Sequence, residues 1–349
     1  MATISLCLIV KNEEQNLDQC LSSVQGIPDE IIIVDTGSTD RTKEIAAKWT
    51  QHIYDFEWID DFSAARNESF KYATKDYILW LDADDIVTPE NKIKLEQLKE
   101  ALTEEVDAVS MNYEIPQDDS RRFISNTTRL RLVKRNAGFS WKGIVHEDIT
   151  TEAPYHFMKS DITVTHTKVG DAQGGRALSR RNLDIYERHL AKGYIFTVPD
   201  MLNYARECHS HKLYKQAIHY YEQCKDHPEI PLENRVFILH KLATCYVYNN
   251  QPEKELELTL EALSMDVPYP AFSCRMGEHF LKSGNLEAAI FWYRSAYSSP
   301  PGKRYSWSPI DHVYHTWLPH QQLSLCYEAL GDTAQAKHHQ QWAEFYRKE

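Results

Sequence analysis

No pair of cysteines in this chain has the C-x-x-C spacing, although the sequence contains seven cysteines. They are scattered along the chain, as Cys7, Cys20, Cys208, Cys224, Cys245, Cys274 and Cys326. A disulfide framework or a cysteine zinc site needs closer and more regular spacing. We therefore expect reduced thiols that are mostly buried in the core.

Long basic runs and long apolar runs are missing as well. The formal net charge is -12, which disfavours a nucleic-acid partner or an anionic-membrane anchor. The first apolar stretch, Ile4–Val10, has about the length of one strand, lacks a basic leader and runs directly into Lys11-Asn12-Glu13-Glu14. It predicts neither a signal peptide nor a membrane span, so the sequence favours a cytoplasmic protein.

Two nucleotide-binding fingerprints are also missing, G-x-G-x-x-G and G-x-x-x-x-G-K-[ST]. Their absence argues against a dehydrogenase and against a P-loop enzyme. A nucleotidyltransferase would share an α/β sheet with paired aspartates, but we would expect a glycine-rich, basic loop after its first strand. Here that place is taken by Lys11-Asn12-Glu13-Glu14.

The sequence does contain apolar strands that end in carboxylates. The run Tyr77–Leu81 is followed by Asp82-Ala83-Asp84-Asp85, and the run Glu30–Val34 is followed by Asp35. Ligands of open α/β sheets collect beyond the carboxyl ends of the strands, and Mg²⁺ or Mn²⁺ takes one or two carboxylates there beside substrate phosphates. Closely spaced carboxylates repel unless a positive charge lies between them. We therefore predict a metal–diphosphate site with Asp84 as its first metal ligand.

Five blocks that occur in order carry a family resemblance. They are Ile4–Glu14, Val34–Asp40, Asp61–Asn67, Asp82–Asp84 and Trp141–Glu147. Together they resemble family 2 glycosyltransferases of the GT-A fold. The combination of the last block with a helical repeat segment is similar to the bacterial subgroup that includes the sublancin S-glycosyltransferase. A single Asp-x-Asp is weak evidence, whereas ordered blocks over about 150 residues are specific for fold and reaction class.

The resemblance implies an α/β GT-A fold, a Rossmann-like nucleotide-binding mixed sheet. It also implies an inverting, metal-dependent hexosyltransferase that moves a sugar from a nucleotide-sugar, a UDP-sugar by expectation, with Mn²⁺ or Mg²⁺ as cofactor. The acceptor it suggests is a peptide or protein side chain, with a glycan or a lipid-linked saccharide as alternatives. A repeat scaffold with a dead transferase domain is a further alternative, against which the intact Asp35, Asp82, Asp84 and Glu147 argue.

By the same resemblance, four residues would bind the nucleotide-sugar. Asp35 would accept a hydrogen bond from the base, and Asp82, with Ala83, would hold the ribose or the water shell of the ion. Arg66 would pair with phosphate or lock Asp82 and Asp84, and a plain structural salt bridge is its alternative role.

Acceptor chemistry needs a base, for which Glu147 is our choice because the family's matching His-Glu block lies at the acceptor side. Asp148 is the second choice, and a solvated acidic loop is the alternative interpretation. His166 ends an alternating strand and would supply a neutral imidazole to the metal, as a later histidine does in several GT-A enzymes; His146 or plain packing are its alternatives.

A strand-like segment, Arg129–Val133, holds further basic groups. Alternation puts Arg129 and Arg131 on one face of it, where they face either a diphosphate or water.

Domain organisation follows from a change of pattern. Apolar strands alternate with helical stretches to about residue 110, and further strands continue to His166, as in a mainly parallel sheet covered by helices. The segment Gly170–Gly175 predicts a linker. Beyond it lie 15 of the 20 tyrosines, in helix pairs whose small and aromatic positions resemble tetratricopeptide repeats. We predict a GT-A domain at 1–170 and a linker with an all-α tetratricopeptide-like solenoid at 171–349, which would bind the acceptor or a second protomer.

Overall fold

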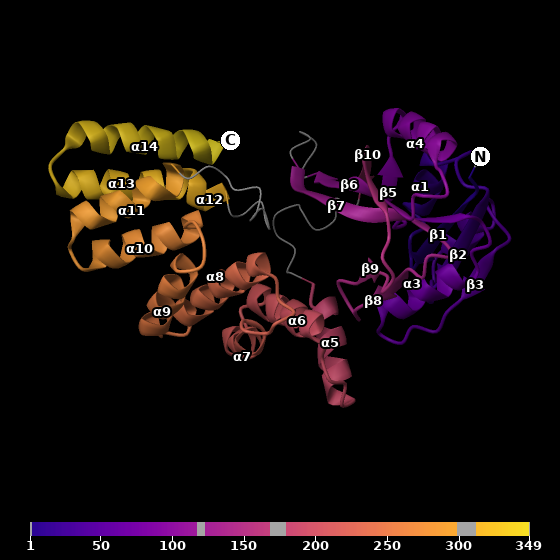
Figure 1. The fold of residues 1–349 in the computed structure, drawn as a ribbon, viewed down its shortest axis with the longest axis horizontal. Coiled ribbons are helices and arrows are strands. Elements are labelled where there is room, and N and C mark those ends of the chain that lie inside the picture. The colour runs from indigo at the N-terminus through magenta and orange to yellow at the C-terminus, as the bar shows by residue number, and fades with distance from the viewer. Residues whose placement is uncertain (1, 117–122, 168–178, 299–311, 349) are drawn as a thin grey trace. The chain divides into compact units, whose positions relative to one another are not determined.

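The structure is a computed structural model that describes residues 2–116, 123–167, 179–298 and 312–348. It consists of two compact units, Met1–Ile195 and Phe196–Glu349, which the colour bar of Figure 1 locates. Helix α5 (Arg181–Ala191) belongs to the first unit, although it lies beyond residue 170. The linker predicted at Gly170–Gly175 lies outside the described residues.

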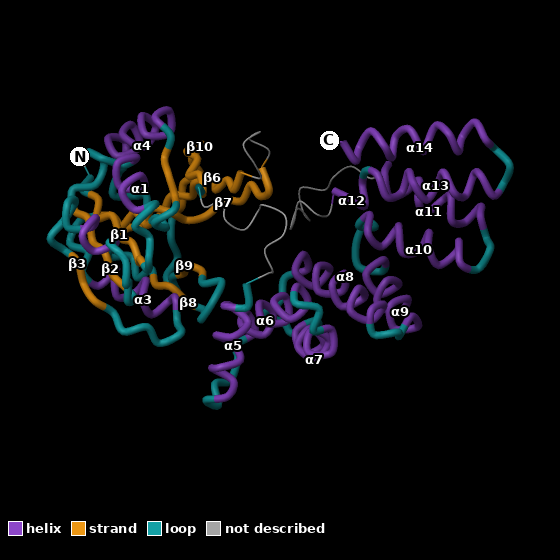
Figure 2. The backbone as a smooth tube through the Cα atoms, turned by 180° about the vertical axis from the view of Figure 1, so that it is seen from behind, coloured by secondary structure: helices purple, strands orange, loops and turns teal. Residues whose placement is uncertain are grey.

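In the described part of unit 1, the core is an eight-stranded mixed sheet of order β3-β2-β1-β4-β7-β6-β10-β5 (Figure 2). A separate hairpin pairs β8 with β9. The strands are β1 Ile4–Val10, β2 Glu30–Asp35, β3 Ile53–Asp55, β4 Tyr77–Trp80, β5 Asp85–Val87, β6 Ala108–Pro116, β7 Phe123–Lys134, β8 Ser140–Lys142, β9 Asp148–Thr150 and β10 Phe157–His166.

Parallel pairing of β1 with β2 and with β4 sets the position of the acidic strand ends. Val10 lies opposite Asp35, and Cys7 lies opposite Trp80. Because the three strands run in the same direction, Asp35 and the turn that begins at Asp82 come to one edge of the sheet. The next strand, β7, is antiparallel to β4, which makes the sheet mixed.

Both faces of the sheet are covered, as continuous apolar strands require. Along β1, Leu6 and Leu8 pack on one face with α1, α2 and α4, whereas Cys7 packs on the other with the end of α3 and with the β8–β9 hairpin. These helices are α1 Leu17–Ser23, α2 Thr42–Ala46, α3 Phe62–Lys71 and α4 Pro89–Ala101. The predicted α/β nucleotide-binding fold is confirmed.

Unit 2 is helical throughout its described part. Its helices pack as the pairs α6–α7, α8–α9, α10–α11 and α13–α14, with the short α12 beside α10 and α13. Their bounds are α6 Val198–Ser210, α7 Tyr214–Cys224, α8 Leu232–Tyr248, α9 Pro252–Leu263, α10 Pro270–Lys282, α11 Leu286–Ser298, α12 His312–His315, α13 Trp317–Ala329 and α14 Thr333–Lys348.

The small residues that suggested repeats lie between these helices. A Cβ at Gly277 would approach the Tyr293 ring to 2.7 Å, so the α10–α11 contact requires glycine there. Ala217 and Ala289 are likewise fully buried. The predicted tetratricopeptide-like organisation is therefore confirmed. The seven cysteines are buried free thiols, and none of the described helices is long and apolar enough to cross a membrane.

Candidate active site

The acidic turn after β4 brings three aspartates to the edge of the sheet. The backbone N–H of Asp85 donates to the carbonyl of Asp82 over 3.0 Å, and the N–H of Asp82 donates to the Asp85 carboxylate over 3.0 Å. The Asp85 side chain is fully buried beneath the turn, whereas Asp82 and Asp84 line a cavity. The turn thus separates one structural aspartate from two that face the cavity.

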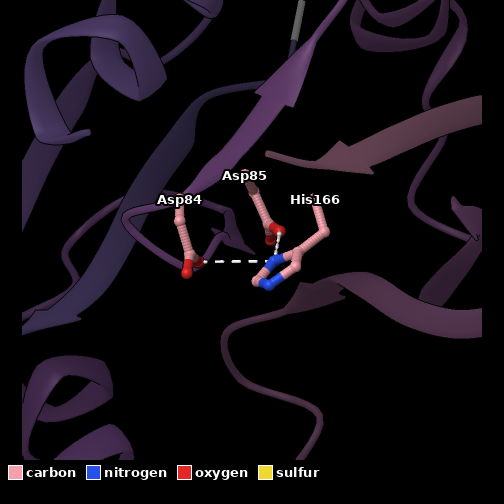
Figure 3. Close-up of side chains that lie close together, drawn as sticks. All are labelled: Asp84, Asp85 and His166. Carbon is pink, nitrogen blue, oxygen red and sulfur yellow. Dashed lines mark hydrogen bonds and ion pairs between the residues drawn. The ribbon is translucent and has the colours of Figure 1, made fainter. Parts of the chain in front are cut away.

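His166 reaches the same turn because β10 is antiparallel to β5, with His166 opposite Asp85. Its Nδ1 lies 3.4 Å from Oδ1 of Asp84 and 3.3 Å from Oδ1 of Asp85 (Figure 3). Candidate ligand atoms of the three side chains all lie within 4.8 Å of one another. Two carboxylates with one imidazole are a donor set that suits a divalent cation such as Mn²⁺, so these residues fit the expected metal.

The electrostatics of His166 point in the same direction. Burial alone would lower the pKa of His166, but the Asp85 hydrogen bond and the nearby Asp84 carboxylate outweigh it and raise the pKa above the ordinary 6.5. The turn therefore favours a positive charge at this position, which a proton or a metal ion supplies.

Arg131 compensates the buried Asp85. Its Nη1 lies 2.9 Å from Oδ2 of Asp85 with both side chains fully buried, and its guanidinium stacks on Trp80 at 3.8 Å. The expectation that Arg131 faces a diphosphate or water is therefore wrong, because this guanidinium neutralises a carboxylate in the core. Arg129 is exposed, lines the cavity and lies over Tyr113 at 4.8 Å.

Arg66 bridges the acidic turn and the predicted base. Its Nη2 donates to Asp82 over 2.7 Å and its Nε donates to Glu147 over 2.7 Å. The guanidinium lies against both Trp80 and Trp141, at 5.0 and 4.7 Å from their ring centroids. Burial by itself would raise the pKa of Asp82, but Arg66 and Arg131 outweigh it and hold this pKa well below its usual range.

Two of the sequence blocks join each other around this arginine. The Ser63 hydroxyl donates to the Gly143 carbonyl over 2.6 Å. Asn67 exchanges two hydrogen bonds with the Trp141 backbone, of 3.0 and 2.8 Å. Hydrogen bonds from helix α3 therefore hold in place the loop that contains Glu147. Gly143 has φ of 101°, a left-handed conformation that a side chain would strain.

Asp35 lies at the end of β2 and is buried. Its Oδ1 accepts from the backbone N–H groups of Gly37 and Ser38, over 2.9 and 2.8 Å. Among the described residues Oδ2 has no hydrogen-bond partner although it is buried. Such an oxygen suits a donor supplied by a ligand. Asp35 itself does not line the cavity, but the next residue, Thr36, does.

The cavity at this edge has a volume of about 510 Å³. Six of the seven predicted site residues line it, namely Arg66, Asp82, Ala83, Asp84, Glu147 and His166. His146 lines it as well, whereas Asp148 is exposed at the start of β9 and does not. The arrangement brings the candidate cation ligands Asp84 and His166 and the predicted base Glu147 together in one cavity.

Sequence reasoning assigned no role to several other lining residues, among them Lys11, Trp58, Phe62, Arg181 and Asn182. Asp85 belongs to the group of candidate cation ligands, but the sequence analysis gave it no role. It directly follows Asp84, and nothing in the local sequence distinguishes it from its neighbour. Arg181 and Asn182 come from α5, beyond the expected boundary, and only tertiary packing brings them here.

Comparison with known proteins identifies the class. Residues 5–163 match the family model of glycosyl transferase family 2, so the chain carries a family 2 glycosyltransferase domain. The predicted family resemblance is confirmed, and the domain is that of a glycosyltransferase.

Relatives resemble the chain beyond that domain. A TPR repeat-containing protein of Synechococcus elongatus is 27% identical over 336 residues, which cover 94% of this chain and 74% of that protein. The SPbeta prophage-derived glycosyltransferase SunS of Bacillus subtilis is 27% identical over 77% of this chain, which spans 64% of the length of SunS.

Two solved structures are similar to parts of the chain. Glucosyl-3-phosphoglycerate synthase from Mycobacterium tuberculosis, in complex with Mn²⁺ and UDP-glucose, has a TM-score of 0.36 at 15% identity, covering 56% of this chain and 81% of that one. MamA has a TM-score of 0.36 at 16% identity, covering 48% of this chain and 87% of that one.

Proposed function

We propose that the chain is an inverting, metal-dependent hexosyltransferase that moves a sugar from a UDP-sugar to an acceptor. The observation that carries this proposal is the single cavity that Asp84 and His166 line together with Arg66 and Glu147. A family 2 domain supplies the reaction class, and the cavity supplies the residue types that the reaction needs.

The donor lies at the edge where β1, β2 and β4 end. Asp84 and His166 would hold Mn²⁺ or Mg²⁺, and Asp85 lies beneath them with its charge compensated by Arg131. The ion, when bound, neutralises the charge of the departing diphosphate. Oδ2 of Asp35 accepts a hydrogen bond from the nucleotide base, while Asp82 and Ala83 contact the ribose.

Transfer is a single displacement at the anomeric carbon. The acceptor's oxygen or sulfur attacks on the face opposite the diphosphate, the new bond forms, and the bond from that carbon to the diphosphate oxygen breaks. Arg66 engages Oε1 of Glu147, so Oε2 takes the acceptor's proton. Attack from the opposite face inverts the anomeric centre. Glu147 is preferred to Asp148 because Glu147 lines the cavity and Asp148 does not.

Unit 2 recognises the acceptor in this proposal, with a peptide or protein side chain as its target. Its helices hold a cavity of about 410 Å³, lined from α8, α10 and α13 among others. A helical repeat surface of this kind suits an extended polypeptide. A glycan or lipid-linked acceptor, or a second protomer on unit 2, are the alternatives.

A thermal-shift screen of UDP-, GDP- and dTDP-sugars, each with and without Mn²⁺, tests the donor assignment. A ligand that binds the folded protein stabilises it by RT ln(1 + [L]/Kd). We expect a shift with a UDP-sugar that requires Mn²⁺ and that disappears in Asp84→Asn. A protein that responds to none of these sugars would instead be the catalytically dead repeat scaffold.

A further inference from the structure

Two aromatic side chains form one wall of the active-site cavity. Trp58 and Phe62 both line it and both are half-buried. Their ring centroids lie 4.8 Å apart with an interplanar angle of 67°, an edge-to-face pair. The guanidinium of Arg181 lies 5.2 Å from the Phe62 ring. The proposed chemistry leaves this apolar wall without a role.

The orientation of Trp58 is fixed by a hydrogen bond. Its indole Nε1 donates to Oδ1 of Asp60 over 3.0 Å. Asp60 itself has φ of 63°, a left-handed conformation that non-glycine residues seldom adopt. A residue held in this conformation depends on its surroundings, so the contacts of Asp60 decide where the indole lies.

Those contacts come from helix α5. Nε and Nη2 of Arg188 donate to the two carboxylate oxygens of Asp60, each over 2.8 Å. The imidazole Nε2 of His189 lies 2.9 Å from the Asp60 carbonyl oxygen. Arg188 lowers the pKa of Asp60, so this side chain stays a carboxylate. A fork of two charged hydrogen bonds also fixes geometry, which a single contact does not.

Helix α5 also supports the neighbouring part of the cavity wall, where the backbone N–H of Phe62 donates to the carbonyl of Ile144 over 3.0 Å. The fully buried Tyr186 donates its hydroxyl hydrogen bond to the carbonyl of Val145 over 2.9 Å, two residues before Glu147. The helix lies outside the residues matched by the glycosyl transferase family 2 model, which end at 163. It is nevertheless part of the first compact unit.

We propose that Arg188 is a positioning residue that, through Asp60, holds Trp58 as the platform for a hexopyranose ring in the cavity. The inference rests on the proposed function. An indole face packs against the C–H face of a sugar ring. The Phe62 ring has the Arg181 guanidinium over it, and the other described lining side chains, histidines aside, are aliphatic, polar or charged. The ring belongs either to the sugar of the donor or to a saccharide acceptor.

A simple anchor for α5 would give the same contacts, so the test must separate sugar binding from stability. In the full chain with Mn²⁺, titration calorimetry would measure the dissociation constant of UDP alone and of UDP-glucose, UDP-galactose and UDP-N-acetylglucosamine. A second arm would measure the methyl glycosides of the same three sugars in the presence of saturating UDP. The variants are Trp58→Leu and Arg188→Ala, with Glu187→Gln as the matched control on α5, where Glu187 pairs with Arg180.

We expect Trp58→Leu and Arg188→Ala to weaken one sugar arm by roughly three- to tenfold, the worth of one aromatic contact, with UDP affinity unchanged. A loss in the UDP-sugar arm assigns the ring to the donor, and a loss in the glycoside arm assigns it to the acceptor. In a Trp58→Phe background, which lacks the Nε1 donor, Arg188→Ala should have little further effect, so the two changes should not be additive. Glu187→Gln should behave as the parent.

Equal losses for UDP and for every sugar ligand, or no loss in either arm, would overturn the platform. If urea unfolding shows that Arg188→Ala does not fold, Asp60→Asn replaces it as the variant. The amide oxygen of this variant still accepts a hydrogen bond from Trp58, but the side chain has no charge to pair with Arg188. A parent protein that binds no UDP with Mn²⁺ would refute the proposed function itself. If the parent binds a UDP-sugar and the variants bind every ligand with the same dissociation constants as the parent, only the platform would be refuted.

Discussion

Arg66 and Glu147 form an ion pair with 2.7 Å between Nε and Oε1, and their side chains are only 10% and 12% exposed. The same guanidinium holds Asp82, so it shares its charge between the acidic turn and the predicted base. The two carboxylates would otherwise repel each other in a poorly solvated place. Of the roles considered for Arg66, a lock is favoured, but between Asp82 and Glu147 rather than between Asp82 and Asp84.

Removal of this arginine should destabilise the protein. We expect Arg66→Met to lower the free energy of unfolding by about 3–5 kcal/mol, because it leaves two poorly solvated carboxylates without their partner. Urea unfolding measures the change. Arg129→Met is the matched control, since Arg129 lines the same cavity but is exposed, and it should change stability by about 0.5 kcal/mol or less. Equal effects of the two substitutions would contradict the lock.

Asp84→Asn should abolish Mn²⁺-dependent UDP binding while leaving the fold intact, because it removes a charged ligand at the sheet edge and no core volume. Calorimetric titration of UDP with and without Mn²⁺ measures this. Asp82→Asn should have a milder effect on affinity if that residue mainly contacts ribose. If the parent bound UDP equally well without the ion, Asp84 would not be a metal ligand.

Glu147→Gln should separate binding from chemistry, since the amide keeps the shape of the side chain but cannot take a proton. UDP-sugar affinity should survive, and turnover should fall by on the order of 10²–10⁴. Hydrolysis of the UDP-sugar, in which water replaces the acceptor, is a suitable assay. Asp148→Asn is the control and should retain activity; the reverse result would move the base to Asp148.

His166 should make the stability of the metal-free protein depend on pH. Its folded pKa is raised above the ordinary 6.5, so its contribution is fully present below that pH and is lost as pH rises through the folded value. Urea unfolding of the parent and of His166→Gln, from about pH 5 to about pH 9, should show a difference that shrinks with rising pH. Mn²⁺ affinity should rise over the same range, because metal and proton compete for Nδ1. A constant difference would exclude this role.

The sequence was informative where chemistry and local structure coincide. Asp35 ends one apolar strand and Asp84 lies in the short turn after another, so strand direction alone predicts that both reach one edge of the sheet. The role of Asp85 depends on Arg131, which lies in β7, 46 residues further along the chain. It also depends on the antiparallel pairing of β5 with β10. A local sequence pattern specifies neither. The role proposed for Trp58 likewise depends on Arg188, 128 residues beyond Asp60.

The same dependence leads to a prediction about fragments of the chain. A fragment that ends at Ile195 keeps α5, with its contacts from Tyr186 to Val145 and from Arg188 to Asp60. We expect it to fold and to bind UDP with Mn²⁺. A fragment that ends at residue 170 exposes the surface that α5 buries and leaves Asp60 without its guanidinium partner, so it should unfold at lower urea concentration.

Transfer to the natural acceptor distinguishes the role of unit 2 in the same pair of fragments. If the helical repeats bind the acceptor, the fragment ending at Ile195 should hydrolyse the UDP-sugar slowly, because water replaces the acceptor, but should not glycosylate the acceptor. The full chain assayed in parallel is the control for both reactions. A fragment that glycosylates the acceptor as fast as the full chain would show that unit 1 alone recognises it, and unit 2 would then serve stability or assembly instead.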